Sequence, residues 1–355
     1  MGGGRWLAQA GSRAAVGLAL ICWLLAPAGG AAPSREWEEG VQAARREGRL
    51  VVYDAFGGAV PTVQYAAERF EATHRVKVEI AVMRASESIE RIRVEQRAGR
   101  AVADLVTAGS GTTRPMLDEG VLRPFERLPS APRIAPQVRL KVQEWELQQY
   151  LLPFLIQLYG ILVNTNLVRP EEEPKSWNDL ADPRWRGRLI MDDPRAPGGG
   201  QVLFQVTYRA LGRRFQEELA AQRPFLTRGI ADAASRVARG EFAVMAPFAL
   251  GLYPRVRGGP VKLIIPREGA PYVPLGVSLP RRSDHPNAAV VFSEFLLSRE
   301  VQVRLMHDFI LPVVRGYDQQ APEEVRPFLR ARLWDTVVDP RVEPEYLRRA
   351  NEIYR

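Results

Sequence analysis

The residues best suited to chemistry lie in five loops, each of which joins a short apolar run to a helical pattern. Three of these loops are rich in Gly, Ser or Thr, and two carry an arginine. Unpaired backbone N–H groups and the helix dipole at such positions favour a carboxylate or phosphate oxygen. The sequence therefore predicts a site for a small anion. The five loops are residues 54–58, 83–86, 108–113, 192–201 and 246–248.

These loops supply the predicted ligand contacts. We expect ligand oxygens to meet backbone N–H groups of residues 110–112 and 198–200, with Arg84 and Arg195 as counter-charges. Three aromatic residues would form an apolar wall. An alternative stays open, in which the glycines only form turns. The expected contact residues are Asp54, Phe56, Gly57, Arg84, Ser110, Gly111, Thr112, Arg195, Gly199, Gly200, Phe248 and Tyr253.

Signatures of enzymes are scarce. The three histidines, His74, His285 and His307, are never three or four residues apart, which argues against a zinc site. His285 precedes a proline at a predicted helix start, so we expect a turn role for it. The adjacent Asp192 and Asp193 would point to opposite faces of a strand end, which argues against an acid/base pair. We expect no catalytic residue, no bound metal and no cofactor.

Apolar runs alternate with helical patterns on both sides of an ambiguous middle region. Two strand-like runs, residues 150–155 and 159–164, separate the two series. This alternation predicts an α/β protein with a largely parallel sheet, helices on both faces and two lobes that share a hinge. The expected strands are residues 50–53, 77–82, 104–106, 188–191, 241–246, 261–265 and 272–279. The expected helices are 37–49, 60–73, 86–98, 201–211, 287–297 and 299–309, and the tail from residue 317 is polar and helical.

The N-terminal segment has the layout of a secretory signal peptide. Two arginines precede the apolar run 14–26, and small residues follow at 27–32. The run is shorter than the roughly 20 residues that a membrane span needs. The single cysteine, Cys22, lies in this run, and because Ile21 precedes it and the run continues, a lipid anchor is disfavoured. We expect removal of residues 1–31 and a periplasmic mature protein.

Composition and charge limit the partners of the mature chain. Of its 355 residues, 46% are hydrophobic and 25% are charged, as in ordinary globular proteins. The net charge of +8 becomes +6 when Arg5 and Arg13 leave with the signal peptide. The remaining arginines are spread beside acidic residues without a basic run, so we expect no nucleic-acid partner. We also expect a monomer. The alternative is a cationic cleft that attracts an anionic ligand.

Several stretches resemble the extracellular solute-binding proteins of ABC importers, in particular the branch that includes the periplasmic ferric-iron-binding proteins. Residues 173–189, with Ser176-Trp177 and Trp185-Arg186-Gly187, resemble the P-x-S-W-x-D-L-x-D-P-x-W-x-G segment of that family. Further similar stretches are residues 47–53, 104–106, 119–122, 159–166 and 285–298 with Gln302. Trp177 and Trp185 are expected to pack inside a lobe.

The resemblance implies a type II periplasmic-binding-protein fold with a central ligand cleft and hinge. We expect lobe 1 at residues 32–155 and 268–320, lobe 2 at 156–267, and a helical tail at 321–355. It also implies capture of a solute without covalent chemistry, and the loop residues described above favour a small anionic one, such as a carboxylate, phosphonate or phosphate ester. The partners would be that solute and an ABC permease with its ATPase.

The resemblance leaves the ligand open. Iron-binding members hold the metal with a tyrosine pair shortly after a Gly-Glu strand, whereas Gly240-Glu241 is followed here by Phe248 and then a single, displaced Tyr253. Without this pair, a small anionic solute stays the first expectation. Ferric iron or an iron chelate, held by Tyr253 or Tyr272, is the alternative ligand. An exported enzyme on the same fold is the alternative of another class.

Overall fold

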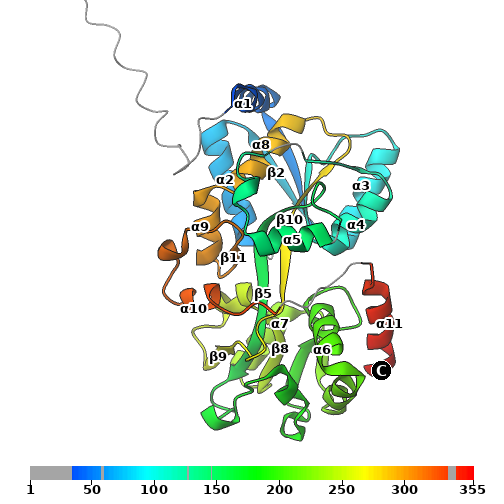
Figure 1. The fold of residues 1–355 in the computed structure, drawn as a ribbon, viewed down its shortest axis with the longest axis vertical. Coiled ribbons are helices and arrows are strands. Elements are labelled where there is room, and N and C mark those ends of the chain that lie inside the picture. The colour runs from blue at the N-terminus through cyan, green and yellow to red at the C-terminus, as the bar shows by residue number, and fades with distance from the viewer. Residues whose placement is uncertain (1–33, 57–59, 126–127, 145, 335–340) are drawn as a thin grey trace, which may run out of the picture.

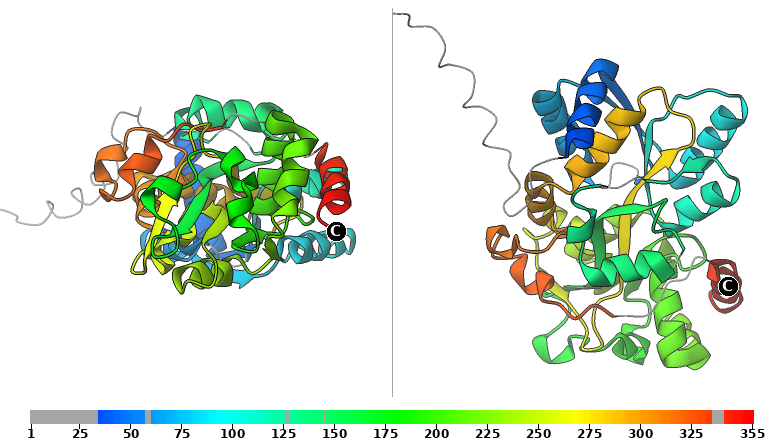
Figure 2. Two further views of the ribbon diagram at one scale, coloured as in Figure 1. Left: turned by 90° about the horizontal axis from the view of Figure 1, so that it is seen from below. Right: turned by 45° about the horizontal axis from the view of Figure 1, so that its top comes forward.

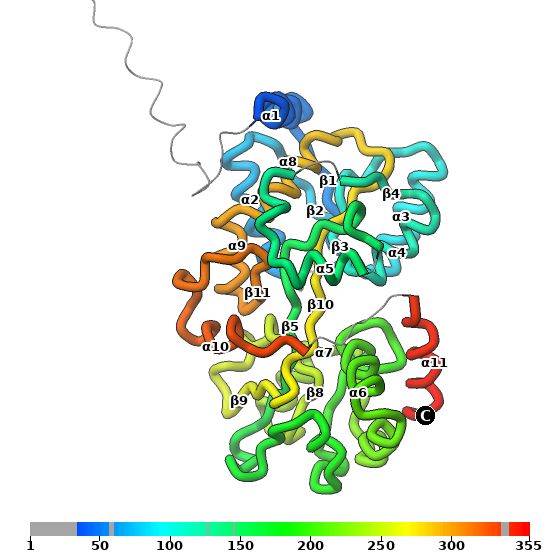
Figure 3. Tube along the Cα trace, in the orientation of Figure 1, coloured from blue at the N-terminus to red at the C-terminus, as the bar shows by residue number. Residues whose placement is uncertain are grey.

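The computed structural model describes residues 34–56, 60–125, 128–144, 146–334 and 341–355. Helices and strands form an upper and a lower group, joined by two long strands (Figures 1 and 3). No helix in these ranges is long and apolar enough to cross a membrane. The predicted signal peptide and Gly57 lie outside the described residues.

The upper group begins with a helix that its own sequence caps at both ends. The Ser34 side chain accepts a hydrogen bond from the Trp37 N–H, and Gly48, at φ 68°, ends the helix. The helix expected over residues 86–98 begins one residue earlier, at Ala85, and Arg84 occupies its N-cap position. The elements are α1 (Arg35–Glu47), β1 (Arg49–Asp54), α2 (Pro61–His74), β2 (Lys77–Val82), α3 (Ala85–Arg97), β3 (Leu105–Ala108), α4 (Ser110–Asp118), β4 (Leu122–Arg123), η2 (Ala131–Arg133) and α5 (Pro136–Glu144).

The two predicted runs at 150–164 form one continuous strand, β5 (Leu152–Asn164), all but two of whose residues are buried. Since both faces are covered, the strand carries a nearly unbroken apolar sequence instead of an alternating one. It runs beside β10 (Tyr272–Pro280), and these two antiparallel strands link the upper and lower groups (Figure 3).

The lower group contains the second β/α series. The predicted helix 201–211 is the first part of a longer one, which is interrupted at Gly212 (φ 82°). The strand predicted at 241–246 begins and ends three residues later, and β7 and α7 were not predicted. The elements are η3 (Pro170–Glu172), η4 (Trp177–Ala181), η5 (Pro183–Trp185), β6 (Leu189–Asp192), α6 (Gly199–Ala221), β7 (Phe225–Thr227), α7 (Ile230–Ala238), β8 (Val244–Ala249), η6 (Leu250–Arg255) and β9 (Val261–Ile264).

The last part of the chain returns to the upper group and then runs down again. Two helices near their predicted positions pack with α1 and α2, as Figure 2 also shows. The tail then ends in a helix beside α6. The elements are α8 (Pro286–Leu296), α9 (Arg299–His307), β11 (Leu311–Pro312), η7 (Asp318–Gln320), α10 (Arg326–Leu329) and α11 (Glu343–Ile353).

The sheet order is β2-β1-β3-β10-β5-β8-β6-β7, with β4 beside β10 and with β9 and β11 beside β5. The outer pairs in each group are parallel, as predicted. The strands at the centre are antiparallel to their neighbours, so the prediction of a largely parallel sheet holds for each group and not for the junction.

The segment that resembles the importer family is a packing element of the lower group. Trp177 is fully buried and donates from Nε1 to the Gly269 carbonyl at 2.9 Å, and Trp185 is 1% exposed. Both belong to one apolar cluster with Leu203 and Phe215 of α6. The predicted packing role of the two tryptophans is confirmed.

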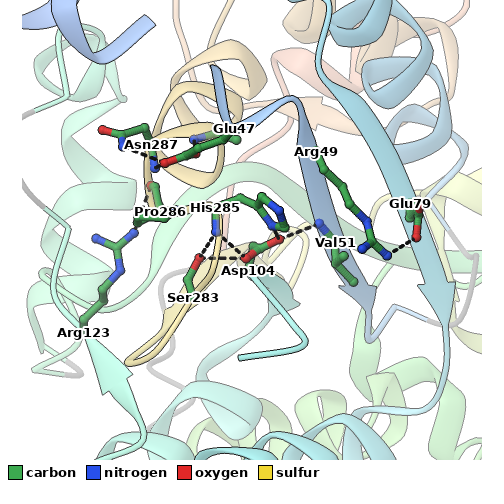
Figure 4. Close-up of polar contacts among 11 residues, drawn as sticks. Glu47, Arg49, Val51, Glu79, Asp104, Arg123, Ser283, His285, Pro286 and Asn287 are labelled. Atoms are coloured by element: carbon green, nitrogen blue, oxygen red, sulfur yellow. Dashed lines mark hydrogen bonds and ion pairs between the residues drawn. The ribbon is translucent and has the colours of Figure 1, made fainter. Parts of the chain in front are cut away.

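A buried carboxylate ties the outer end of the upper group together (Figure 4). Asp104 accepts hydrogen bonds from the Val51 N–H at 2.8 Å and the Ser283 hydroxyl at 2.7 Å. It also accepts from the His285 N–H, and the His285 Nδ1 lies 2.8 Å from it. His285 thus holds the turn before α8, which is the role predicted for it.

Candidate functional site

A pocket of about 140 Å³ lies between the two groups of elements. Phe56 and Val60 come from the upper group, and Leu275 comes from the crossing strand β10. Gln157 and Tyr159 lie on β5, so residues from both groups and both crossing strands enclose one space. The lower group completes the lining with Asp192, Gly199, Ile230, Pro247 and Ala249.

Asp192 ends strand β6 and holds the glycine-rich loop that follows. Its Oδ2 accepts a hydrogen bond from the Gly200 N–H at 2.8 Å. A Cβ at Gly200 would stand 2.1 Å from the Asp192 carbonyl, so only glycine fits there. The prediction that the backbone of residues 198–200 receives ligand oxygens is therefore wrong at Gly200, whose N–H donates to the protein's own carboxylate. The Gly199 N–H also hydrogen-bonds to this carboxylate.

Burial raises the pKa of Asp192 to about 6, although the hydrogen bond from Gly200 works in the opposite direction. Tyr159 lies next to this carboxylate: a Cβ at Gly199 would be 2.7 Å from Tyr159 Cε1 and 3.2 Å from Asp192 Oδ2. Burial, and secondarily the Asp192 charge, raise the pKa of Tyr159. The lower side of the pocket is thus a carboxylate beside a neutral phenol.

Arg195, predicted as a counter-charge for the ligand, is engaged within the protein. Its Nε and Nη2 both donate to Asp193 at 2.9 Å, and its Nη1 donates to the Tyr354 carbonyl at 2.9 Å. Such a forked pair leaves the guanidinium little capacity for another anion. The residue does not line the pocket.

Of the residues predicted in the loops before α2 and α3, Phe56 lines the pocket, whereas Asp54 and Arg84 do not. Asp54 is 2% exposed, and its Oδ1 accepts from the Thr107 hydroxyl at 3.0 Å and the Phe56 N–H at 3.1 Å, so it shapes the loop from inside. The Phe56 backbone bridges to Arg84. The Arg84 side chain is exposed and makes no ion pair with another described residue.

The start of α4 lies close to the pocket. Gly109, which precedes the helix, lies against Leu275 of the pocket wall. Ser110 and Thr112 are each 7% exposed, and no side chain caps this helix end. The carboxylate of Glu343 lies against Gly111, since a Cβ added there would stand 3.4 Å from its Oε2.

Two residues of the predicted apolar wall lie elsewhere. Phe248 is fully buried in a core cluster of the lower group, because its strand neighbours Pro247 and Ala249 face the pocket and alternation turns Phe248 the opposite way. Tyr253 packs on Phe309, with ring centroids 5.4 Å apart. Phe56 remains as the predicted aromatic residue of the wall.

Sequence reasoning missed several lining residues, among them Gln157, Tyr159 and Ile230. Gln157 had a usable signal, because it is the one polar side chain inside the apolar run 151–163. Tyr159 and Ile230 had none, since an aromatic residue in a strand or an isoleucine at a helix start is ordinary. Among the described lining residues none is Ser, Thr, Cys, Lys or His, the usual nucleophiles and bases. The described residues also hold no cluster of three His, Cys, Asp or Glu side chains able to bind a metal.

Known proteins resemble this chain in sequence and in structure. A curated relative, an uncharacterized protein of Haemophilus influenzae, is 28% identical over 161 residues, which are 43% of this chain and 46% of that protein. The chain thus matches less than half of that relative's length.

Solved structures share the fold, among them the following three. A ferric binding protein from Campylobacter jejuni is 21% identical with a TM-score of 0.70, over 86% of this chain and 98% of that one. Iron-bound HitA from Pseudomonas aeruginosa is 18% identical (TM-score 0.71; 86% and 99%). The FutA protein of Trichodesmium in complex with iron and citrate is 19% identical (0.70; 86% and 99%).

The family of bacterial extracellular solute-binding proteins matches residues 101–331, well over half of the chain. The similar structures are two-lobed periplasmic binding proteins, and the two groups of elements with their connecting strands have the same arrangement. The predicted α/β fold of two lobes is confirmed, and the chain belongs to the bacterial extracellular solute-binding proteins.

Proposed function

We propose that this protein captures a small solute between its lobes and delivers it unchanged to an ABC permease with its ATPase. The supporting observation is the pocket whose lining comes from both lobes and both crossing strands. A ligand that touches both lobes favours the closed arrangement, because its differential affinity shifts the open/closed equilibrium. Closure in turn distinguishes the loaded protein for the permease.

The proposed division follows the sequence: lobe 1 at residues 32–155 and 268–320, lobe 2 at 156–267. The two strands that cross between the lobes support it, as do the apolar clusters, of which one lies mainly in lobe 1 and two lie in lobe 2. A periplasmic, monomeric mature protein without residues 1–31 is part of the same proposal.

The proposed solute is a small acid that also carries a hydrogen-bond donor. The start of α4 and the exposed Arg84 supply positive potential on lobe 1. Asp192 and Tyr159 on the opposite side accept from a hydroxyl or amine of the ligand. Phe56, Val60 and Ile230 would cover its carbon skeleton.

Arg84→Ala tests this assignment in calorimetric titrations with a panel of carboxylates, phosphonates and phosphate esters. Removal of a charge-assisted hydrogen bond weakens binding by about tenfold to a hundredfold. The control is Arg100→Ala, an arginine that is also exposed and lies just past the far end of α3, about 20 Å along the helix. Unaltered affinity in Arg84→Ala would refute the anion contact.

Ferric iron, bare or as a chelate, is the second candidate. The pocket brings the carboxylate of Asp192 and the phenol of Tyr159 together, and both are oxygen donors that suit a hard cation. Tyr253 and Tyr272 do not line the pocket. A visible charge-transfer band on addition of ferric citrate, lost in Tyr159→Phe, supports iron; a colourless protein with no thermal shift excludes it.

The enzyme alternative makes a different prediction. A binding protein returns its solute intact, whereas a lyase or transferase leaves a new product. Mass spectrometry of each bound solute after incubation separates the two, and recovery of unchanged ligand is the expected result.

A further inference from the structure

The chain continues past the family match, which ends at residue 331, and finishes in helix α11. This helix packs on α6 of the lower lobe (Figures 1 and 3). Phe204, Ala350 and Tyr354 form a buried cluster there, with Tyr208 and Tyr346 at its edge. Aromatic burial of this kind fixes a short helix firmly to its neighbour.

Polar contacts add to this docking. The Tyr354 hydroxyl donates to Gln216 Oε1 at 3.0 Å, and Tyr354 is 4% exposed. Arg349 Nη1 donates to the Tyr208 hydroxyl at 2.7 Å. The last turn of α11 also accepts the hydrogen bond from Arg195. The helix therefore belongs structurally to the lower lobe.

The first turn of α11 meets the upper lobe instead. Arg341, just before the helix, contacts Glu146 at 3.3 Å. The Glu343 carboxylate lies against Gly111 at the start of α4. Most of α11 therefore packs on the lower lobe, while its first turn and the residue just before the helix contact the upper lobe.

The position of Glu343 has a chemical meaning. The N–H groups of Thr112 and Thr113 donate to the Gly109 carbonyl at 3.1 and 2.9 Å. Those of Ser110 and Gly111 have no acceptor within the helix, and Gly109 offers no side chain to cap them. An acidic group is favoured beside such an end. The Glu343 carboxylate is largely withdrawn from water, and this burial raises its pKa. No arginine or lysine offsets that cost through a hydrogen bond among the described residues.

We propose that α11 is a built-in strap whose Glu343 occupies, in the empty protein, the place at the start of α4 where the acidic group of the solute binds. This inference rests on the proposed function, since it concerns the same site. Solute and Glu343 compete, and binding of the solute releases the upper contact of the strap. The tail thereby lowers the apparent affinity for acids and joins the lobes when no solute is present.

A simple estimate gives the size of the effect. If Glu343 is docked for nine-tenths of the time, one-tenth of the molecules are competent to bind, and the apparent dissociation constant is about tenfold higher than without the strap. Glu343→Gln should therefore tighten the binding of an acidic solute by about tenfold. Glu345→Gln is the matched control, because it makes the same change two residues along on an exposed side chain that pairs with Arg349.

The test uses the mature chain and both variants with two independent readouts. Amide hydrogen exchange without any ligand should be faster at Ser110 and Gly111 in Glu343→Gln than in Glu345→Gln. Calorimetry with citrate and with inorganic phosphate should show tighter binding in Glu343→Gln alone. Equal exchange in the two variants, or equal affinities, would overturn the strap. An exchange difference with no acid bound by any of the three proteins would overturn the solute class, and with it the competition, while lobe closure on a non-acidic solute would stand.

Discussion

At the scale of single residues, Asp192 combines structure and recognition. Its carboxylate holds the glycine loop through Gly200 and faces the pocket, and burial raises its pKa to about 6 from an ordinary value near 3.8. Because this pKa is higher in the folded than in the unfolded state, binding of the proton to Asp192 contributes to the free energy of unfolding. That contribution is complete below about pH 4. It is lost as the pH rises through 6.

Asp192→Asn should remove this pH dependence. Relative to the wild type, the variant's free energy of unfolding should rise by up to about 3 kcal/mol between pH 4 and pH 7, because the wild type must then bury a charge. Urea unfolding at both pH values measures it. Asp193→Asn is the control, and its effect on the pH dependence of unfolding should have the opposite sign. Burial disfavours the Asp193 charge, but the hydrogen bonds from Arg195 outweigh burial and lower the pKa of Asp193. Parallel profiles for wild type and Asp192→Asn would contradict the prediction.

At the scale of elements, the tryptophan segment shows how a sequence motif anchors a lobe. Trp177→Ala should lower the free energy of unfolding by about 3 to 5 kcal/mol, since it opens a cavity beside α6 and removes a buried hydrogen bond to Gly269. Leu140→Ala, at a side chain 58% exposed on α5, should stay within about 0.5 kcal/mol. Chemical denaturation measures both, and equal losses would show that Trp177 is no anchor.

The sequence predicts an element correctly when residues close in the chain determine it, and less well when contacts with distant residues do. Strand β2 and the end of α1 follow from alternation and from Gly48, both of which are local signals. β5 was divided in two because its continuity comes from burial between β10 and β8, which a local pattern cannot express. The prediction of the site failed for the same reason. Phe248 and Arg195 have suitable side chains, but the alternation of strand β8 turns Phe248 away from the pocket, and Asp193 binds Arg195.

At the scale of the whole molecule, the function requires the lobes to move as units. Solution scattering of the mature protein should give a smaller radius of gyration once a bound solute is found, because closure brings the lobes together. The protein with Phe56→Ala at the pocket wall should bind more weakly and close only at higher solute concentrations. A scattering profile that is unchanged by a solute bound in calorimetry would contradict closure.

The paired strands between the lobes are not regular along their length. The β10–β5 ladder shifts register between Leu275 and Gly276, and the β5–β8 ladder shifts between Gly160 and Leu162. Interrupted pairing bends more easily than an intact ladder. Both irregularities lie on the strands that cross between the lobes. We therefore expect a small change in backbone angles at these residues to produce a larger displacement at the outer ends of the lobes.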